Sequence, residues 1–426
     1  MPFIADLHIH SKYSRACSKN LDLPHIWAWC QLKGIDLVST ADFTYPAWFK
    51  EIHEKLEETA PGIYGLKKEF QKEAADVYIP EKCQRPAHFI LSTEISLIYK
   101  KGEKTRKVHH VILAPDVKTV AKINVELDKR GNIKSDGRPI LGLDSKELLK
   151  LLLDIDPDIE LIPAHAWTPH FAIFGSVSGF DSMEECFEEL SDHIHALETG
   201  LSSDPLMNWR LSQNDKYVLV SNSDAHSLPK MGREATVFDC EMTYPAILRA
   251  LRHDHKQIAG TIEFYPEEGK YHADGLRAEG LCLAPEETKK MKNISPKTGK
   301  KITVGVLHRV SDLADRKMGE KPKTARPFWH IIPLTEILAE ILQVGGVSKK
   351  VDELYSKLLQ EVGPEFYILK DAPIADISRV NEMVGEAICR MRASQVIIQP
   401  GYDGEYGIIR LFKPEELVGK DQMKLF

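Results

Sequence analysis

Short apolar runs alternate with amphipathic stretches along roughly the first 265 residues. The apolar runs are rich in leucine and β-branched residues, which is typical of buried strands, whereas residues 23–33 and 145–154 have helical periodicity. Strands that alternate with helices in this way build a parallel sheet or barrel. We therefore predict an α/β protein in which residues 1–265 form a TIM-like β/α barrel.

The pattern changes after residue 265. Turn-rich sequences at 269–275 and 295–300 flank a short basic helix near 285–292, so we predict a small knuckle-like insert over residues 266–310. Residues 311–421 are predicted to form a mainly helical C-terminal domain. Its amphipathic helices and closing strands are expected at 334–342, 349–361, 377–392, 395–398 and 408–411.

Histidine and acidic residues follow several of the apolar runs. Successive side chains of a strand point to opposite faces, so His8 and His10 share one face and can bind one metal ion. Because the carboxyl ends of barrel strands meet at one rim, we expect such residues to converge there. The residues with this placement are His8, His10, Asp42, Glu94, His165, Asp224 and His226.

Histidine and carboxylate ligands suit zinc, manganese or iron, and a carboxylate such as Glu94 can bridge two ions that share a substrate oxygen. Bound ions would activate water and neutralise a phosphate. For any single histidine, such as His25 or His53, a hydrogen-bonded structural role is the commoner case. For the whole set, repeatedly placed at strand ends, we favour a metal site.

The composition is that of an ordinary globular protein, with 43% of its 426 residues hydrophobic and 28% charged. No apolar run is long enough to cross a bilayer and no signal peptide is evident, so we expect a cytoplasmic protein without membrane contact. The seven cysteines lack C-x-x-C spacing, which favours reduced thiols. A net charge of −7 argues against indiscriminate polyanion binding but leaves room for a local basic face.

These motifs resemble those of the PHP (polymerase and histidinol phosphatase) superfamily of trinuclear metal phosphoesterases, over most of residues 1–260. The resemblance implies a distorted, PHP-type form of the barrel and two or three divalent metal ions, which would be zinc, manganese or magnesium. It also adds His109 to the ligands. His110 competes for the same position, and His109 is preferred because it lies five residues ahead of Ala114.

The sequence departs from the superfamily pattern at two places. The second motif of the superfamily usually carries a histidine where this chain has Asp42, so we expect Asp42 to replace it as a ligand. A further ligand often follows the first histidine pair, but Arg15 and Ala16 stand there. One metal position is therefore expected to be weakened or lost.

Within the superfamily the chain resembles the endonuclease Q group, also in segments beyond the barrel. The matching segments are 197–205, 208–210, 221–227, 232–234, 305–310 and 400–404. The resemblance implies a DNA repair endonuclease that nicks double-stranded DNA 5′ to deaminated bases (hypoxanthine, uracil, xanthine) or abasic sites by metal-activated water. Asp224 and His226 are then expected to act in catalysis as well as in metal binding.

Recognition of an extruded base uses aromatic and amide side chains, and phosphates attract arginines. The candidates for these DNA and lesion contacts are Trp167, Asn208, Trp209, Arg210 and Arg233. The alternative is that each tryptophan packs the core and each arginine forms a surface contact or salt bridge.

In related endonucleases the insert carries cysteines that hold a structural zinc ion. Residues 276–280 and 295–299 of this chain contain no cysteine. The resemblance therefore implies a degenerate zinc-knuckle-like DNA-binding module over 266–310, and we expect no structural zinc there. Packing must then replace the free energy that zinc binding contributes to folding.

The last five residues, 422–426, resemble the Gln-x-x-Leu-Phe peptide by which bacterial repair and replication proteins bind the sliding clamp. Gln422, Leu425 and Phe426 carry the resemblance, and an extended tail can insert two apolar side chains into a groove. We expect a clamp-binding tail in a bacterial, nucleoid-associated protein; the alternative is a frayed end.

Two other functions remain open. A PHP-type phosphatase or exonuclease would act with the same ligands on a small phosphate ester or a DNA end. A non-catalytic, clamp-bound DNA-binding protein is favoured to some extent by the incomplete ligand set. A measurement of bound metal distinguishes the non-catalytic DNA-binding protein from the two kinds of enzyme.

Overall fold

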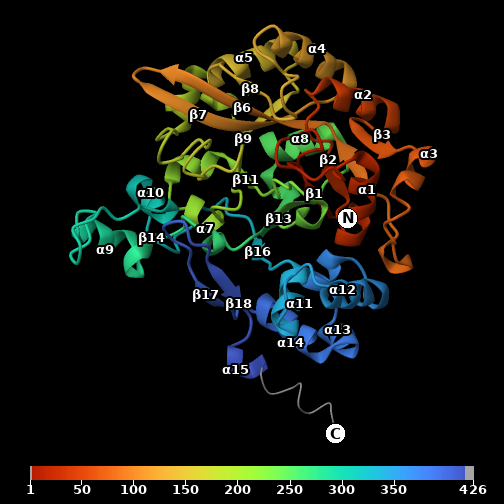
Figure 1. Ribbon diagram of the computed structural model, residues 1–426. Helices are drawn as coiled ribbons and strands as arrows, with labels where there is room; N and C mark the ends of the chain where they lie inside the picture. The colour runs from red at the N-terminus through yellow and green to blue at the C-terminus, as the bar shows by residue number, and fades with distance from the viewer. Residues whose placement is uncertain (1, 418–426) are drawn as a thin grey trace.

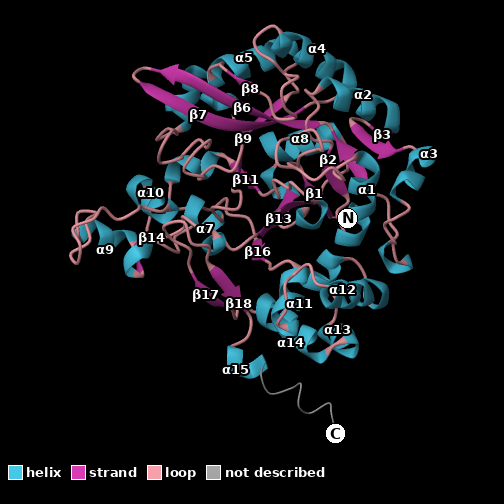
Figure 2. Ribbon diagram, viewed as in Figure 1, coloured by secondary structure: helices cyan, strands magenta, loops and turns pink. Residues whose placement is uncertain are grey.

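The structure, a computed structural model, describes residues 2–417. Several β-sheets lie in the upper part of the molecule with helices around them, and a cluster of C-terminal helices lies below (Figure 1). Figure 2 shows the same division between strands and helices. The predicted α/β class is confirmed.

The largest sheet has eight strands, with β1 (Phe3–Asp6) near its middle. β1 pairs in parallel with β2 and antiparallel with β12. In spatial order the other strands are β16 (Phe328–His330), β13 (Ile258–Glu263) and β12 (Ala235–Phe238) on one side, and β2 (Leu37–Ser39), β5 (His88–Ile90), β4 (Ile63–Leu66) and β3 (Leu56–Ala60) on the other.

A second sheet is built on the long hairpin of β6 (Ser92–Lys101) and β7 (Lys104–Leu113), which pair along their whole length. The hairpin projects from the upper edge of the molecule (Figure 1). β8 (Ile140–Leu141) and β9 (Glu160–Pro163) complete this sheet, and β10 (Ala196–Glu198) pairs in parallel with β11 (Val218–Val220) beside it.

The prediction of a barrel closed by parallel strands is not confirmed. Between residues 2 and 417 the strand ladders form separate sheets with both parallel and antiparallel pairs, and no closed barrel. The physical reason is the short hairpin turns of β3–β4 and β6–β7. A hairpin makes the two strands antiparallel, whereas a parallel pair needs a longer crossover connection such as a helix. Single hydrogen bonds, such as that from the Ala166 amide to the Glu198 carbonyl at 3.0 Å, join the sheet edges.

The main helices of residues 2–300 are α1 (Leu23–Lys33), α2 (Pro46–Lys55), α3 (Lys68–Gln71), α4 (Val117–Asp128), α5 (Ser145–Ile155), α6 (Met183–Phe187), α7 (Pro205–Asn208), α8 (Tyr244–Arg252) and α9 (Pro285–Lys290). α1 has the predicted bounds because the Asp22 side chain accepts a hydrogen bond from the His25 amide and Gly34 ends the helix at φ 83°. No helix among residues 2–417 has the length and apolar character needed to cross a membrane.

The rest of the chain contains α10 (Val306–Leu313), α11 (Leu334–Leu342), α12 (Lys349–Glu361), α13 (Ile374–Val380), α14 (Glu382–Arg392) and α15 (Pro414–Leu417), with β17 (Ile397–Gln399) paired to β18 (Ile408–Arg410). The single helix predicted over 377–392 is wrong. It is two helices, because Asn381 leaves the helical conformation and its side chain accepts a hydrogen bond from the Val384 amide as the cap of α14.

The insert is held together by polar contacts. Its hairpin, β14 (Asp274–Leu276) with β15 (Leu281–Leu283), lies beside α9 and α10. The Glu279 carboxylate accepts hydrogen bonds from the hydroxyl groups of Ser295, at 2.7 Å, and Thr298. These bonds join segments 276–280 and 295–299, which contain no cysteine.

The apolar core begins one residue before the candidate metal ligands. Phe3, Ala5 and Leu7 belong to a fully buried cluster that includes Ile247 and Leu251 of α8. His8 follows Leu7 directly and is itself buried, so this ligand lies next to the packed interior. Rigid packing behind the ligands restricts their rotamers.

Candidate metal centre

The two histidine-bearing segments lie side by side, although more than 200 residues separate them in the chain. The Asp224 amide donates to the His8 carbonyl at 2.9 Å, and the His10 amide donates to the Ala225 carbonyl at 3.0 Å. Ile9 and Ala225 form a parallel bridge between these bonds. His8 and His10 therefore lie beyond the end of β1 and are held by backbone pairing with 224–225.

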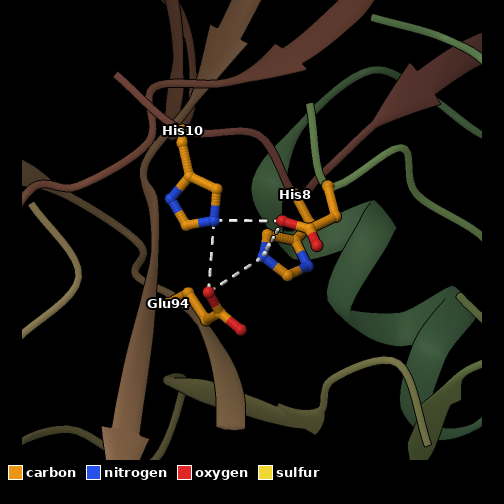
Figure 3. A group of neighbouring side chains, drawn as sticks. His8, His10 and Glu94 are labelled. Carbon is orange, nitrogen blue, oxygen red and sulfur yellow. Dashed lines mark ion pairs between the residues drawn. The ribbon is translucent and has the colours of Figure 1, made fainter. Parts of the chain in front are cut away.

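The first ligand group consists of His8, His10, Glu94 and Asp224, whose ligand atoms all lie within 4.8 Å of one another. His10 Nε2 is 3.2 Å from Glu94 Oε2 and 3.0 Å from Asp224 Oδ1. His8 Nε2 is 3.6 Å from the same glutamate oxygen. Figure 3 shows both imidazole rings pointing toward Glu94.

The second ligand group consists of Glu94, His109 and His165. Glu94 Oε1 is 2.6 Å from His109 Nδ1 and 3.1 Å from His165 Nε2. Glu94 is thus common to both groups, each of which contacts a different oxygen of its carboxylate. This is the arrangement in which one carboxylate can bridge two ions.

Glu94 lies within a strand rather than after one, which corrects the placement expected from the sequence. It is the third residue of β6 and pairs with Val111 of β7, while His109 pairs with Ser96. Because side chains alternate along a strand, Glu94 and Ser96 share a face with Val111 and His109. The hairpin therefore delivers both Glu94 and His109 to the site.

The same alternation separates His109 from His110. His110 points to the other face, where its Nε2 lies 2.9 Å from Ser145 Oγ and its ring packs against Phe187. Burial, together with the charge of neighbouring His109, lowers the pKa of His110 to about 3. Of the two histidines that the sequence left in competition, His109 is the one that reaches the ligand cluster.

The donor atoms fit a divalent ion. His8 Nε2, His10 Nε2 and Asp224 Oδ1 are fully buried and have no hydrogen-bond partner among residues 2–417. Buried polar atoms are normally hydrogen-bonded, so three such atoms that lie close together without a hydrogen bond indicate a missing partner. Imidazole nitrogens and carboxylate oxygens are ligands for zinc, manganese or iron.

Asp42 lies behind the first group and is outside both ligand groups. Its Oδ1 is 3.2 Å from His10 Nδ1, and its Oδ2 accepts hydrogen bonds from the amide and hydroxyl of Ser11 and from the hydroxyl of Ser14. Burial alone would raise the pKa of Asp42, but the bonds from His10 and Ser11 hold it below its usual value. In this position an ionised Asp42 orients the His10 ring.

Glu198 contacts Nδ1 of His8 as Asp42 contacts Nδ1 of His10. Glu198 was not identified from the sequence. His8 Nδ1 lies 3.0 Å from Glu198 Oε1, and the His165 amide donates to Oε2 at 2.7 Å. Burial lowers the pKa of His8, but the charges of Glu198 and Glu94 outweigh this effect and raise it well above its usual range. Glu198 ends the apolar run of β10, and that position at a strand end was the available signal.

His226 lies at the rim of the cluster. Its Nδ1 donates to the Asp224 carbonyl at 2.9 Å, and its ring centroid lies 4.5 Å from that of His10. This bond leaves Nε2 as the free nitrogen of a neutral ring, and burial lowers the pKa of His226. His226 is part-buried and outside both ligand groups.

Arg138 was also missed. Its Nη1 donates to Glu94 Oε2 at 2.9 Å, so one arginine reaches the carboxylate that the two groups share. Burial opposes ionisation of Glu94, but the charges of His109, Arg138 and His8 hold its pKa well below the usual range. Nothing in the sequence distinguishes Arg138 from other arginines, because its role arises from tertiary contact.

Trp167 and Asn208, two of the five residues predicted to contact DNA, lie in the interior. Trp167 is 1% exposed and its Nε1 donates to Asn208 Oδ1 at 2.8 Å, while Asn208 is fully buried. Direct contact with DNA would require this bond to break and the ring to leave the core. The packing role that the sequence left open for the tryptophans therefore describes Trp167 in this structure, and Asn208 is its buried hydrogen-bond partner.

The other three predicted DNA contacts also make internal contacts. Trp209 packs edge-on against Phe328, and the Arg210 carbonyl accepts hydrogen bonds from the amides of 315 and 316. Arg233 Nε donates to the Ser223 carbonyl at 2.9 Å and thereby braces the segment that carries Asp224. The predicted clamp-binding residues Gln422, Leu425 and Phe426 lie outside the described residues.

Two curated proteins resemble the chain in sequence. It is 31% identical over 261 residues to the uncharacterized protein MJ0043 of Methanocaldococcus jannaschii and spans 32% of that protein's length. It is 27% identical over 424 residues to the uncharacterized protein YqxK of Bacillus subtilis, with 95% of this chain and 98% of YqxK covered. Residues 333–395 match the MJ0043 C-terminal domain family.

Two solved structures match along the full length. The crystal structure of the lesion-specific endonuclease PfuEndoQ from Pyrococcus furiosus is 31% identical, with a TM-score of 0.84 over 100% of this chain and 98% of that one. An endonuclease Q complex with a 27-mer duplex substrate, which has an abasic lesion at the active site, is 31% identical, with a TM-score of 0.82 over 100% of both chains.

The fold and the buried ligand cluster together define a hydrolase of the DNA nuclease class. The chain belongs to the endonuclease Q family.

Proposed function

We propose that this protein is a DNA repair endonuclease that nicks the phosphodiester 5′ to deaminated bases (hypoxanthine, uracil, xanthine) or abasic sites in double-stranded DNA. The observation that carries the proposal is the pair of ligand groups joined by Glu94, in a chain that matches endonuclease Q along its full length. The match to a complex with an abasic duplex supports the same class of substrate.

The metal requirement follows from the donor set. Two or three divalent ions (zinc, manganese or magnesium) would supply Lewis acidity and an activated water molecule when bound. His8, His10 and Asp224 would hold one ion with Glu94, and His109 and His165 would hold another through the second oxygen of Glu94. The ligand set thus supports a PHP-type centre, with Asp42 and Glu198 orienting its histidines.

The catalytic residues of the proposed reaction are Asp224 and His226. Asp224 contributes a ligand oxygen, and its backbone carbonyl fixes the tautomer of His226. Since His226 is neutral with Nε2 free, this nitrogen can accept a proton from the attacking water and pass it to the leaving sugar oxygen. In this scheme the water–phosphorus bond forms as the phosphorus–oxygen bond to the leaving sugar breaks.

The direct test uses end-labelled duplexes that contain one uracil, one hypoxanthine or one abasic site, each incubated with the protein and Mg²⁺, Mn²⁺ or Zn²⁺. We expect a single nick on the 5′ side of the lesion and none in a matched undamaged duplex. Intact lesion duplexes, in the presence of protein shown to carry metal, would refute the proposal.

A phosphatase or exonuclease is the second candidate function, because metal ions held by the two ligand groups would bind phosphate in the same way whatever the ester. Turnover of a phosphomonoester or of a DNA end, without nicking at internal lesions, would favour it. A non-catalytic DNA-binding protein would bind the same duplexes without cleaving either kind of substrate.

We also propose that residues 422–426 bind a bacterial sliding clamp, on the sequence resemblance of Gln422, Leu425 and Phe426. A DNA repair enzyme with this tail would work at the nucleoid in the cytoplasm. Deletion of 422–426 is expected to abolish clamp binding in a pull-down and to leave nicking of free duplexes intact. Clamp binding that survives the deletion would contradict the assignment.

A further inference from the structure

The proposed reaction leaves the role of Arg138 unassigned. Its side chain is 26% exposed and reaches Glu94 from the segment between α4 and β8. Among residues 2–417 it is the one lysine or arginine ion-paired to a carboxylate of the two ligand groups. It is therefore the fixed positive charge of the centre.

The segment that carries Arg138 is anchored on both sides. The Gly137 amide donates to the Tyr13 carbonyl at 3.1 Å, and the Pro139 carbonyl accepts from the Ser96 amide at 3.0 Å. The Asp136 carboxylate accepts from the amides of Arg15, at 3.2 Å, and Arg138, at 3.0 Å. Arg138 is thus held by contacts to the chain after His10 and to β6.

The backbone at 137 passes so close to the site that a side chain would not fit. A Cβ atom on Gly137 would lie 2.4 Å from Asp42 Oδ2 and 2.5 Å from Ser14 Oγ. The glycine therefore brings the chain against the carboxylate that orients His10, one residue before Arg138. The position of the guanidinium is fixed by the same atoms that fix the first ligand group.

Most of the hydrogen-bonding capacity of Arg138 is unused. Within residues 2–417 its side chain makes one hydrogen bond, through Nη1 to Glu94 Oε2 at 2.9 Å. A guanidinium group has five N–H donors in a planar fork, which fits the oxygens of a phosphate. These donors lie at a part-exposed position beside the ligand that both groups share, so they are available to a ligand that reaches the metal centre.

We infer that Arg138 binds a non-bridging oxygen of the phosphodiester that is cut at the metal centre. This inference rests on the proposed function and names a substrate contact within it. One edge of the guanidinium stays on Glu94, and the remaining donors bind the phosphate through charge-assisted hydrogen bonds. Arg138 thereby brings a positive charge to the phosphate at the metal centre.

The test compares Arg138→Ala, Arg138→Lys and the control Lys134→Ala in the metal-loaded, full-length protein. Lys134 lies in the same segment but is 62% exposed and pairs with Asp128. The first readout is the affinity for inorganic phosphate by isothermal titration calorimetry, which requires no DNA cleavage. We expect a loss of roughly 10- to 100-fold for alanine, a smaller loss for lysine and no change for the control.

The second readout is nicking of an abasic duplex under multiple-turnover conditions. Loss of a donor to the reacting phosphate should lower kcat on the order of 10²-fold in Arg138→Ala, with a smaller change in KM. Metal content and the thermal unfolding midpoint are measured for every variant, and Arg138→Lys keeps the experiment decisive if the alanine variant fails to fold.

Failures of the inference and of the proposed function are distinguishable. If the wild type carries metal but nicks no lesion, the proposed function fails, and phosphate affinity alone decides the role of Arg138. If Arg138→Ala binds phosphate as tightly as the wild type, the inference is overturned. A fall in metal content that accounts for the whole loss of activity would likewise overturn it, because Arg138 would then act only as the partner of Glu94.

Discussion

Two buried carboxylate clusters lie close together in this protein, and the pKa shifts of their glutamates have opposite signs. In the metal centre, Glu94 is surrounded by His8, His109 and Arg138, which hold its pKa well below the usual range although burial opposes this. In the second cluster, Glu263 is fully buried and accepts hydrogen bonds from the hydroxyls of Thr199 and Ser221. Burial there raises the pKa of Glu263 to about 7.

Glu234 completes the second cluster. Burial and the charge of Glu263 raise its pKa well above the usual range, and its amide contact with 264 offsets little of this effect. The pKa of the same side-chain type is thus lowered where histidines and an arginine surround it, and raised where it is buried beside a second carboxylate. A cluster whose carboxylates stay ionised beside histidines is suited to bind metal, whereas in the second cluster burial favours the neutral carboxyl group.

The substitution expected to have the largest effect is Glu94→Gln. The amide keeps the shape of the side chain but cannot bridge two cations, so both ligand groups should lose metal together. Nicking should fall on the order of 10³-fold, as measured on an abasic duplex, and mass spectrometry should find less than half of the bound metal. Full metal content with normal nicking would show that Glu94 is not shared between the two groups.

Asp42→Asn tests how much the negative charge that faces a ligand histidine contributes to metal affinity, compared with the charge of the ligand Glu94. The amide removes the negative charge that faces His10 Nδ1 at 3.2 Å, so metal affinity should fall roughly 10- to 100-fold by competition with a chelator. Asp128→Asn, an exposed change at a residue paired with Lys134, is the matched control. An unchanged affinity would remove Asp42 from the metal centre.

Glu263→Gln tests the second cluster through the pH dependence of stability. The folded-state pKa of Glu263, about 7, exceeds the unfolded value near 4.3, so the folded protein holds the proton more tightly. This stability is fully present below the unfolded pKa and is lost as pH rises from about 4 to about 7. The glutamine variant should therefore gain on the order of 2 kcal/mol relative to wild type between pH 5 and pH 8.

The measurement is urea unfolding of both proteins across that pH range. Glu353→Gln, at a side chain 64% exposed on α12, serves as the control and should leave the pH profile unchanged. A wild-type profile that rises between pH 5 and pH 8, in parallel with that of the Glu263 variant, would show that Glu263 is ionised in the fold.

The smallest effect is expected for Thr168→Val. Thr168 Oγ1 donates to the His170 carbonyl at 2.8 Å and lies 3.2 Å from His165 Nδ1, so it supports the second ligand group with a neutral acceptor. Metal affinity should fall only a few-fold, about 1 kcal/mol, because a neutral hydrogen bond is replaced. If Thr168→Val loses as much metal affinity as Asp42→Asn, then the negative charge of Asp42 is not what makes it the stronger support of a ligand histidine.

The sequence predicted the elements whose signals are local. α1 has the predicted bounds because its capping residues, Asp22 and Gly34, are local signals, and α11 because its apolar periodicity is. The split of 377–392 at Asn381 was missed because the apolar pattern continues across it, while the cap depends on one side-chain hydrogen bond. The closed barrel is not confirmed, because hairpin pairing between whole strands, which the sequence does not display, decides the direction of neighbouring strands.

The residues of the candidate site also divide into those with a local sequence signal and those whose role depends on tertiary contacts. His8, His10 and Asp224 were predicted because their spacing at the ends of apolar runs is visible in the chain. Glu198 and Arg138 were not, because each acquires its role from a residue many positions away, His8 in one case and Glu94 in the other. Glu198 carries only the general signal of a strand end and Arg138 carries none, so the role of each is visible only once its partner is in place.

The backbone bonds between 8–10 and 224–225 also set the time at which the centre can form. The Asp224 amide reaches the His8 carbonyl only after the ribosome has released more than half of the 426 residues. Closing a loop of this length costs conformational entropy, so the first ligand group assembles late in folding. A nascent or truncated chain that ends before residue 224 contains His8 and His10 but lacks Asp224, and so carries no complete first ligand group.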